Sequence, residues 1–155
     1  MIQRIQSVYL LLAGILSAIA FFVPLAYFSG GTGTWVMYTT AISDLSPAQA
    51  GVDIPSLPWG ILIFALASFI VPVFCIFKYH NRKLQVRLCT TSIAAYILYY
   101  AAYIAYGFTI SRSLASGFTP TIYVALPLFA MLAVILARKA IKSDEEKVRA
   151  ADRIR

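Results

Sequence analysis

Four long apolar segments, separated by polar or charged connections, dominate the sequence. They run over residues 8–28, 57–77, 88–110 and 119–137, and none contains Asp, Glu, Lys, Arg or His. Each is close to the ~20 residues that a helix needs to cross the ~30 Å hydrocarbon core of a bilayer. Because an unpaired backbone amide in lipid costs several kcal/mol, each segment is expected to be helical. The pattern predicts an all-α protein whose residues 1–137 form a four-helix transmembrane bundle.

Polar residues and prolines at the segment borders indicate where helices begin. Ser56 before Leu57-Pro58 has the form of a helix cap followed by an early proline, and so does Thr119-Pro120. In the charged tail, residues 138–155, Ser143-x-x-Glu146 is a capping-box pattern. The tail is therefore predicted to be a short cytoplasmic helix of its own.

The one longer external loop is expected between the first and second segments, over residues 29–56. Its stretch from Thr34 to Thr40 is rich in aromatic and β-branched residues. Such a stretch favours either a short strand or a segment on the membrane surface, anchored by Trp35 and Tyr38.

The distribution of Lys and Arg predicts the orientation of the chain. Of the 13 basic residues, all except Arg112 lie in the N-terminal tip, in the 78–87 connection or in the tail. Basic residues accumulate on the cytoplasmic side of membranes, so both termini are predicted to be cytoplasmic. We expect these segments to form a surface for lipids or a partner, with these candidates: Arg4, Lys78, Arg82, Lys83, Arg87, Arg138, Lys139, Arg149, Arg153 and Arg155.

Two competing interpretations receive less support. The net charge of +7 would suit a nucleic-acid binder, but the basic residues flank apolar segments instead of forming a soluble patch, so no nucleic-acid partner is expected. Residues 1–20 end in Ala18-Ile19-Ala20, a pattern that a signal peptidase can cleave. The apolar run continues to Phe28, which is too long for a typical signal peptide.

Five tyrosines of the third segment fall on one side of the predicted helix. Tyr96, Tyr99, Tyr100, Tyr103 and Tyr106 recur at helical spacing and span an arc of about 120°. We call them the tyrosine stripe. Several lie near the middle of the segment, where a hydroxyl needs a hydrogen-bonding partner.

The other three segments offer such partners, because each contains a proline. Pro24, Pro72 and Pro127 each release the carbonyl four residues earlier, at Ala20, Ser68 and Tyr123, and the hydroxyls of Ser17 and Ser68 are further candidates. One interpretation is that the stripe faces inward and bonds to these groups. The other is a polar, aromatic cavity that binds a lipid head group, a quinone ring or another flat ligand.

The sequence shows little that supports catalysis or metal binding. His80 is the only histidine. Cys75 and Cys89 are interpreted as packing residues, and their places at the ends of consecutive helices suit them to be neighbours. The apolar segments lack the ionisable group that ion-coupled transport requires. We therefore expect no cofactor, no metal and no enzymatic activity.

Both ends of the chain resemble a known family. Residues 1–13, MIQRIQSVYLLLA, are similar to the opening of an uncharacterised family of four-span membrane proteins from the Bacteroidetes, domain of unknown function 4293. Residues 137–155 look like the ending of that family. The resemblance implies an inner-membrane location in a Gram-negative cell, and it carries no known activity, substrate or catalytic residue.

We expect a non-catalytic inner-membrane protein that serves as an accessory or scaffold subunit. It would contact another inner-membrane or cytoplasmic protein through its cytoplasmic ends. The alternative is a carrier of lipid or quinone that uses the tyrosine stripe.

Overall fold

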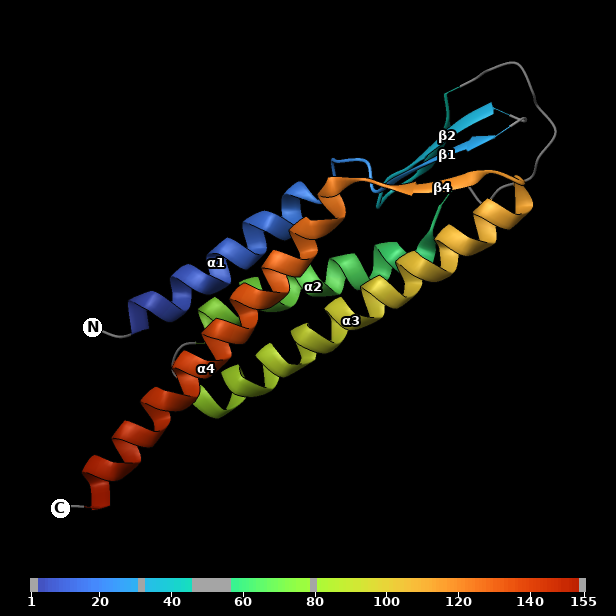
Figure 1. The fold of residues 1–155 in the computed structure, drawn as a ribbon. Coiled ribbons are helices and arrows are strands. Elements are labelled where there is room, and N and C mark those ends of the chain that lie inside the picture. Colours follow the sequence, from blue (N-terminus) through green and yellow to red (C-terminus); the bar gives the residue numbers. More distant parts are fainter. Residues whose placement is uncertain (1–2, 31–32, 46–56, 79–80, 154–155) are drawn as a thin grey trace.

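Four α-helices form most of the molecule. The structure, a computed structural model, describes residues 3–30, 33–45, 57–78 and 81–153. The helices are α1 (Gln3–Ile19), α2 (Trp59–Phe77), α3 (Arg82–Ser113) and α4 (Ala125–Arg153). Each packs on two neighbours: α1 and α3 both contact α2 and α4 (Figure 1). Helices α2, α3 and α4 are long and apolar enough to cross a membrane, whereas α1 is a shorter apolar helix.

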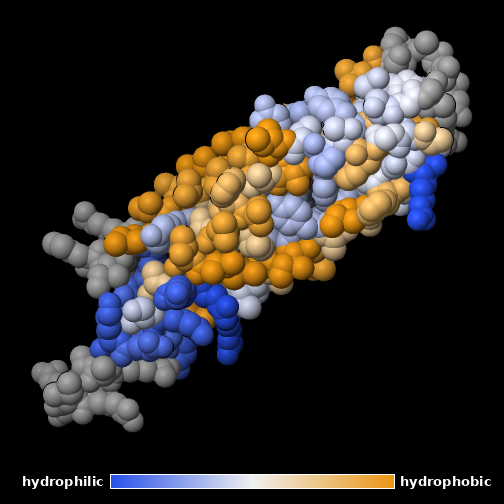
Figure 2. Space-filling view, viewed as in Figure 1, coloured by the Kyte–Doolittle hydropathy of each residue, from blue (hydrophilic) through white to orange (hydrophobic). Residues whose placement is uncertain are grey.

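The outward surfaces of these helices are apolar. Figure 2 shows a hydrophobic region across the middle of the visible face, between a hydrophilic end and a mixed opposite end. On α1 the exposed side chains are Ile5, Val8, Leu11, Leu12, Ile15 and Ile19. Water-soluble proteins rarely expose an apolar surface of this extent, so the region is suited to lipid.

A small antiparallel sheet lies at one end of the helices, so the all-α prediction was wrong. The strands are β1 (Ala26–Gly30), β2 (Gly33–Met37), β3 (Ile42–Asp44) and β4 (Gly117–Pro120), in the order β3-β2-β1-β4. Strand β2 confirms the strand alternative for the aromatic stretch of the external loop. The indole of Trp35 packs against the core beside the sheet.

The predicted first helix is wrong over residues 20–28. It was expected to reach Phe28, but α1 ends at Ile19 and β1 begins at Ala26. The physical reason is Pro24, which has no N–H to continue the helix. The next amide, Leu25 N–H, bonds instead to the Met37 carbonyl at 2.7 Å, which starts the pairing of β1 with β2.

The predicted start of the fourth helix was also wrong. Thr119 and Pro120 belong to β4, where they pair with β1, and α4 begins at Ala125 after the 3₁₀ turn Ile122–Val124. β4 is an edge strand, the position in a sheet that tolerates proline. At the second helix Pro58 occupies the cap position itself, and Ser56 lies outside the described residues.

The charged tail continues α4 without interruption to Arg153, so the separate tail helix and its capping box at Ser143 were wrong. Ser143 lies inside the helix. Ala, Lys, Glu and Arg dominate this part of the sequence and are strong helix formers, which outweighs the local capping pattern.

The buried residues form two clusters, one at each end. The first joins the sheet to the first half of α2 and the second half of α3, and we call this part of the molecule the sheet end. The second lies where α1 and α3 begin, α2 ends and α4 continues toward Arg153; we call it the basic end. The start of α1 and the end of α4 thus lie at the same end of the molecule (Figure 1).

Close backbone packing holds the sheet against α3. A Cβ atom placed on Gly107 of α3 would lie 2.8 Å from the ring of Phe118 in β4, so glycine allows the ring to rest on the helix. Beyond α3, Ser116 N–H bonds to the Ser111 carbonyl and Ala115 N–H to the Arg112 carbonyl, the two hydrogen bonds of a Schellman motif. Ala115 takes the left-handed position of that motif, with φ 47°, which turns the chain into β4.

Candidate functional site

The tyrosine stripe faces the interior of the helices, as predicted. Tyr96, Tyr99 and Tyr103 are buried, with 0%, 1% and 5% of their surfaces exposed, and Tyr100 and Tyr106 are half-buried. The rings of Tyr99 and Tyr100 meet edge to face, and Tyr103 packs beside Phe118 of the sheet. The stripe therefore connects the helical core to the sheet end.

Tyr96 links three helices through its hydroxyl. It lies 2.6 Å from Ser17 Oγ of α1 and donates to the Ser68 carbonyl of α2 at 3.2 Å. Since a hydroxyl has one proton, Ser17 is the donor toward Tyr96. The Ser68 carbonyl is the one released by Pro72, so the predicted pairing of the stripe with a proline-released carbonyl is confirmed at this position.

The other hydroxyls of the stripe bond to different groups than expected. Tyr100 donates to the Val124 carbonyl at 2.7 Å, and Tyr103 donates to the Leu25 carbonyl at 3.2 Å. Tyr106 accepts a long hydrogen bond from Gly60 N–H, at 3.5 Å.

The end of α1 is satisfied by two threonines that the sequence did not single out. The Ala20 carbonyl accepts from Thr39 at 2.8 Å, and the Pro24 carbonyl accepts from Thr121 at 2.5 Å. Thr121 also reaches the Leu25 carbonyl at 3.1 Å. Because unpaired backbone groups are costly within a membrane, these side chains allow α1 to unwind before the sheet. Only the fold brings them to α1, so no local signal marked either.

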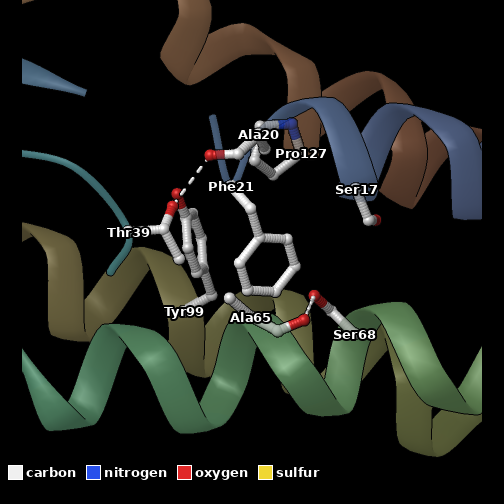
Figure 3. A pocket seen from close by; sticks show the side chains of 8 residues that line it. All are labelled: Ser17, Ala20, Phe21, Thr39, Ala65, Ser68, Tyr99 and Pro127. Carbon is white, nitrogen blue, oxygen red and sulfur yellow. Dashed lines mark hydrogen bonds between the residues drawn. The ribbon is translucent and has the colours of Figure 1, made fainter. Parts of the chain in front are cut away.

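A small cavity lies beside the buried stripe (Figure 3). Its lining residues come from all four helices and from the segment after β2: Ser17, Ala20, Phe21, Thr39, Ala65, Ser68, Tyr99 and Pro127. Its volume of ≈ 10 Å³ suffices for about one water molecule. Ligand pockets for ring-sized molecules usually measure about 300–1,000 Å³.

A larger groove of ≈ 390 Å³ opens on the outer surface near the end of α1. It is lined by Ala18, Phe21, Phe22, Thr40, Leu66 and Phe69, and no tyrosine of the stripe contributes to it.

At the basic end, Asp144 of α4 joins three helices. Its carboxylate accepts a hydrogen bond from the Gln6 side chain of α1, and its backbone carbonyl accepts one from Arg82 Nη1 of α3 at 3.3 Å. Asp144 is 9% exposed and Gln6 is 6% exposed. The N-terminal helix, the beginning of α3 and the extension of α4 are therefore tied to one another.

The two cysteines are neighbours in the same region. Cys75 Sγ and Cys89 Sγ are 3.9 Å apart, both free and both buried. Gln85 joins the same contact, because its side chain donates to the Cys75 carbonyl at 3.2 Å. Within the described part of the chain, no group of three or more His, Cys, Asp or Glu residues is placed to hold a metal ion.

The predicted basic candidates fall into three groups. Lys78, Lys83, Arg87 and Lys139 are exposed, whereas Arg82 and Arg138 are half-buried. Arg138 Nε is buried and has no hydrogen-bond partner among the described residues. The remaining candidates lie outside the described side chains: Arg4, Arg149, Arg153 and Arg155.

Comparison with known proteins gives a family but no activity. A search of curated proteins finds no match. The profile of an uncharacterised family matches residues 2–154, almost the whole chain, in agreement with the resemblance seen at the two ends. The chain therefore belongs to the family described as Domain of unknown function (DUF4293).

Proposed function

We propose that this is a non-catalytic integral protein of the cell inner membrane, an accessory or scaffold subunit that contacts its partner through the basic end. Both termini would then face the cytoplasm, because basic segments are retained on that side. The observation that carries the proposal is the double role of Asp144, which fixes α1, α3 and α4 in one arrangement. A surface that is already rigid loses little entropy when it binds.

The proposal includes α1 as a fourth span. Its 17 residues cover only about 26 Å as a helix. Its outward face is nevertheless apolar, and the chain beyond Ile19 continues with its carbonyls bonded to Thr39 and Thr121. Non-helical backbone is tolerated at membrane depth where protein buries it.

The charge of the basic end indicates the chemistry of the partner. Its exposed basic side chains, among those described, are Lys78, Lys83, Arg87, Lys139, Lys142 and Lys147. Glu146 is the one exposed acidic side chain described on the same end. We therefore infer an acidic partner surface, flanked by anionic lipid head groups.

The alternative, a lipid or quinone carrier built on the stripe, receives less support from the geometry. Four of the stripe's five hydroxyls bond to protein groups, and the cavity beside Tyr99 has room for about one water molecule. Native mass spectrometry of the full chain remains its test. A quinone or lipid that is retained by the wild type and lost from Tyr100→Phe would favour the carrier.

Site-specific photocrosslinking in native membranes tests the scaffold proposal. A photoreactive residue at position 139, on the exposed side of α4, should give a discrete protein adduct. The same residue at position 108, which is exposed on the apolar surface of α3, should give none.

Charge reversal of Lys139 and Lys142 should abolish an adduct formed from a photoreactive residue at position 83. Arg112→Glu at the sheet end serves as the matched control and should leave that adduct intact. A protein that gives no adduct from positions 83 and 139, and that purifies as a monomer in mild detergent, would contradict the proposal.

A further inference from the structure

We propose that the cavity beside Tyr99 is a binding site for a single water molecule. The first observation is the Tyr99 side chain, which is 1% exposed and lines the cavity, yet whose hydroxyl makes no hydrogen bond of normal geometry to any described residue, although Thr39 lies close to it. Buried hydroxyls without a partner are uncommon in folded proteins. An unpaired one at membrane depth therefore points to a ligand with which it can bond.

The size of the cavity restricts that ligand to a very small molecule. Its volume of ≈ 10 Å³ is at the lower limit for holding one water. The ring of Phe21 and the side chains of Ala65 and Pro127 complete the lining (Figure 3). An organic ligand has no room.

The neighbouring hydroxyls are suited to accept hydrogen bonds from a water molecule, because each already donates its own proton to another group. Thr39 donates to the Ala20 carbonyl at 2.8 Å, and Ser68 Oγ donates to the Ala65 carbonyl at 2.9 Å. Ser17 Oγ donates to the Tyr96 hydroxyl, because that hydroxyl itself donates to the Ser68 backbone carbonyl. These three hydroxyls can thus only accept further hydrogen bonds, whereas Tyr99 can donate or accept. A water supplies two donated protons and accepts from Tyr99.

The position of the cavity gives the water a structural role. The cavity is lined by Ala20 and Ser68, whose carbonyls are released by Pro24 and Pro72, and by Pro127 itself. The proline-altered stretches of α1 and α2 therefore meet here, beside the first turn of α4. Ordered water is one of the means by which proline-interrupted helices are satisfied inside membranes.

A monovalent cation is the competing occupant, since the polar side-chain atoms of the lining residues are all hydroxyl oxygens. The structure favours water for two reasons. The Ala20 and Ser68 carbonyls, the strongest ligands available, already accept hydrogen bonds from Thr39 and Tyr96. No carboxylate lines the cavity to offset a positive charge.

Proton NMR of the full chain in detergent, with labelled tyrosine, tests the proposal on the wild-type protein. The hydroxyl proton of Tyr99, assigned by its loss in Tyr99→Phe, should show a cross-peak to water. A cross-peak to Thr39 without one to water would overturn the proposal, because Tyr99, which lies close to Thr39, would then bond to it directly.

Thermal unfolding supplies an independent measurement. Tyr99→Phe removes one partner of the bound water and should lower the melting temperature by about 2–6 °C. Tyr106→Phe is the matched control and should have a smaller effect, since Tyr106 is half-buried and its one hydrogen bond measures 3.5 Å. An unchanged or higher melting temperature for Tyr99→Phe would contradict the proposal. A wild-type melting temperature that rises with sodium but not with choline chloride would assign the cavity to a cation.

Discussion

The two ends of the molecule hold the same helices together by different chemistry. At the sheet end, neutral hydroxyls of Tyr103 and Thr121 bond to carbonyls released where α1 unwinds. At the basic end, the Asp144 carboxylate accepts a hydrogen bond from the Gln6 side chain, and the Arg82 guanidinium donates one to the Asp144 backbone carbonyl. Burying an unpaired charge costs far more than burying a hydroxyl, so neutral contacts suit the interior of the helices and charged contacts suit a helix end. The sheet end is thus held by neutral, closely packed contacts, and the basic end by contacts of charged side chains.

The largest effect is expected from Gly107→Ala, which disrupts the packing of the sheet on α3. The added methyl group would lie 2.8 Å from the Phe118 ring, so the sheet must shift away from α3. We expect a loss of about 2–3 kcal/mol in unfolding free energy, measured by chemical denaturation in detergent. Without that contact the same change would stabilise the helix, by up to about 1 kcal/mol. The double variant Gly107→Ala, Phe118→Leu should recover part of the loss; no recovery would refute this packing argument.

Asp144→Ala is the corresponding change at the basic end. It leaves the buried Gln6 amide without its acceptor, and a buried donor without a partner costs about 1–3 kcal/mol. The expected result is a lower unfolding free energy together with faster proteolysis of the α4 extension. Glu146→Ala removes an exposed carboxylate from the same turn and should change neither. Equal effects of the two variants would show that charge, and not the Gln6 contact, matters here.

Tyr96→Phe tests the neutral contacts between the two ends. It removes the hydrogen bond to the Ser68 carbonyl and leaves Ser17 without its acceptor. Hydrogen bonds between membrane helices are worth on average about 0.6 kcal/mol, and at most about 1.7 kcal/mol. A double-mutant cycle with Ser17→Ala should give a coupling energy in this range. A coupling of zero would mean that the tyrosine contributes by packing alone.

The sequence predicted the helices far better than the sheet, for a physical reason. A span longer than the bilayer core leaves a clear apolar pattern, because every residue in it meets lipid or protein. Ala26–Gly30 is just as apolar as a helix end, and its pairing with Gly117–Pro120 joins segments about 90 residues apart. The tyrosine stripe was visible because its spacing is local. Thr39 was not, since only the sheet brings it to Ala20.

Ala115→Gly should stabilise the sheet end slightly. Ala115 occupies the left-handed position that follows α3, where a side chain is strained and glycine is the usual residue. Replacing it should raise the unfolding free energy by about 0.5–1 kcal/mol. Ala105→Gly is the control, because Ala105 is exposed and lies within α3, away from its ends. This change should lower the unfolding free energy by a similar amount. A loss of stability in Ala115→Gly would mean that the methyl group makes a contact worth more than the strain.

The smallest effect is expected for Lys139→Gln with Lys142→Gln at the basic end. Both side chains are exposed, and substitutions of exposed residues usually change the unfolding free energy by no more than about 0.5 kcal/mol. Their binding to vesicles containing anionic lipid should nevertheless weaken, since each basic residue near such a surface contributes about 1 kcal/mol. Arg112→Gln at the sheet end is the control for both measurements. If the lysine variant were as unstable as Asp144→Ala, the exposed lysines would contribute to the stability of the fold. The proposed division of the basic end, into groups that hold the helices together and exposed groups that contact a partner, would then be wrong.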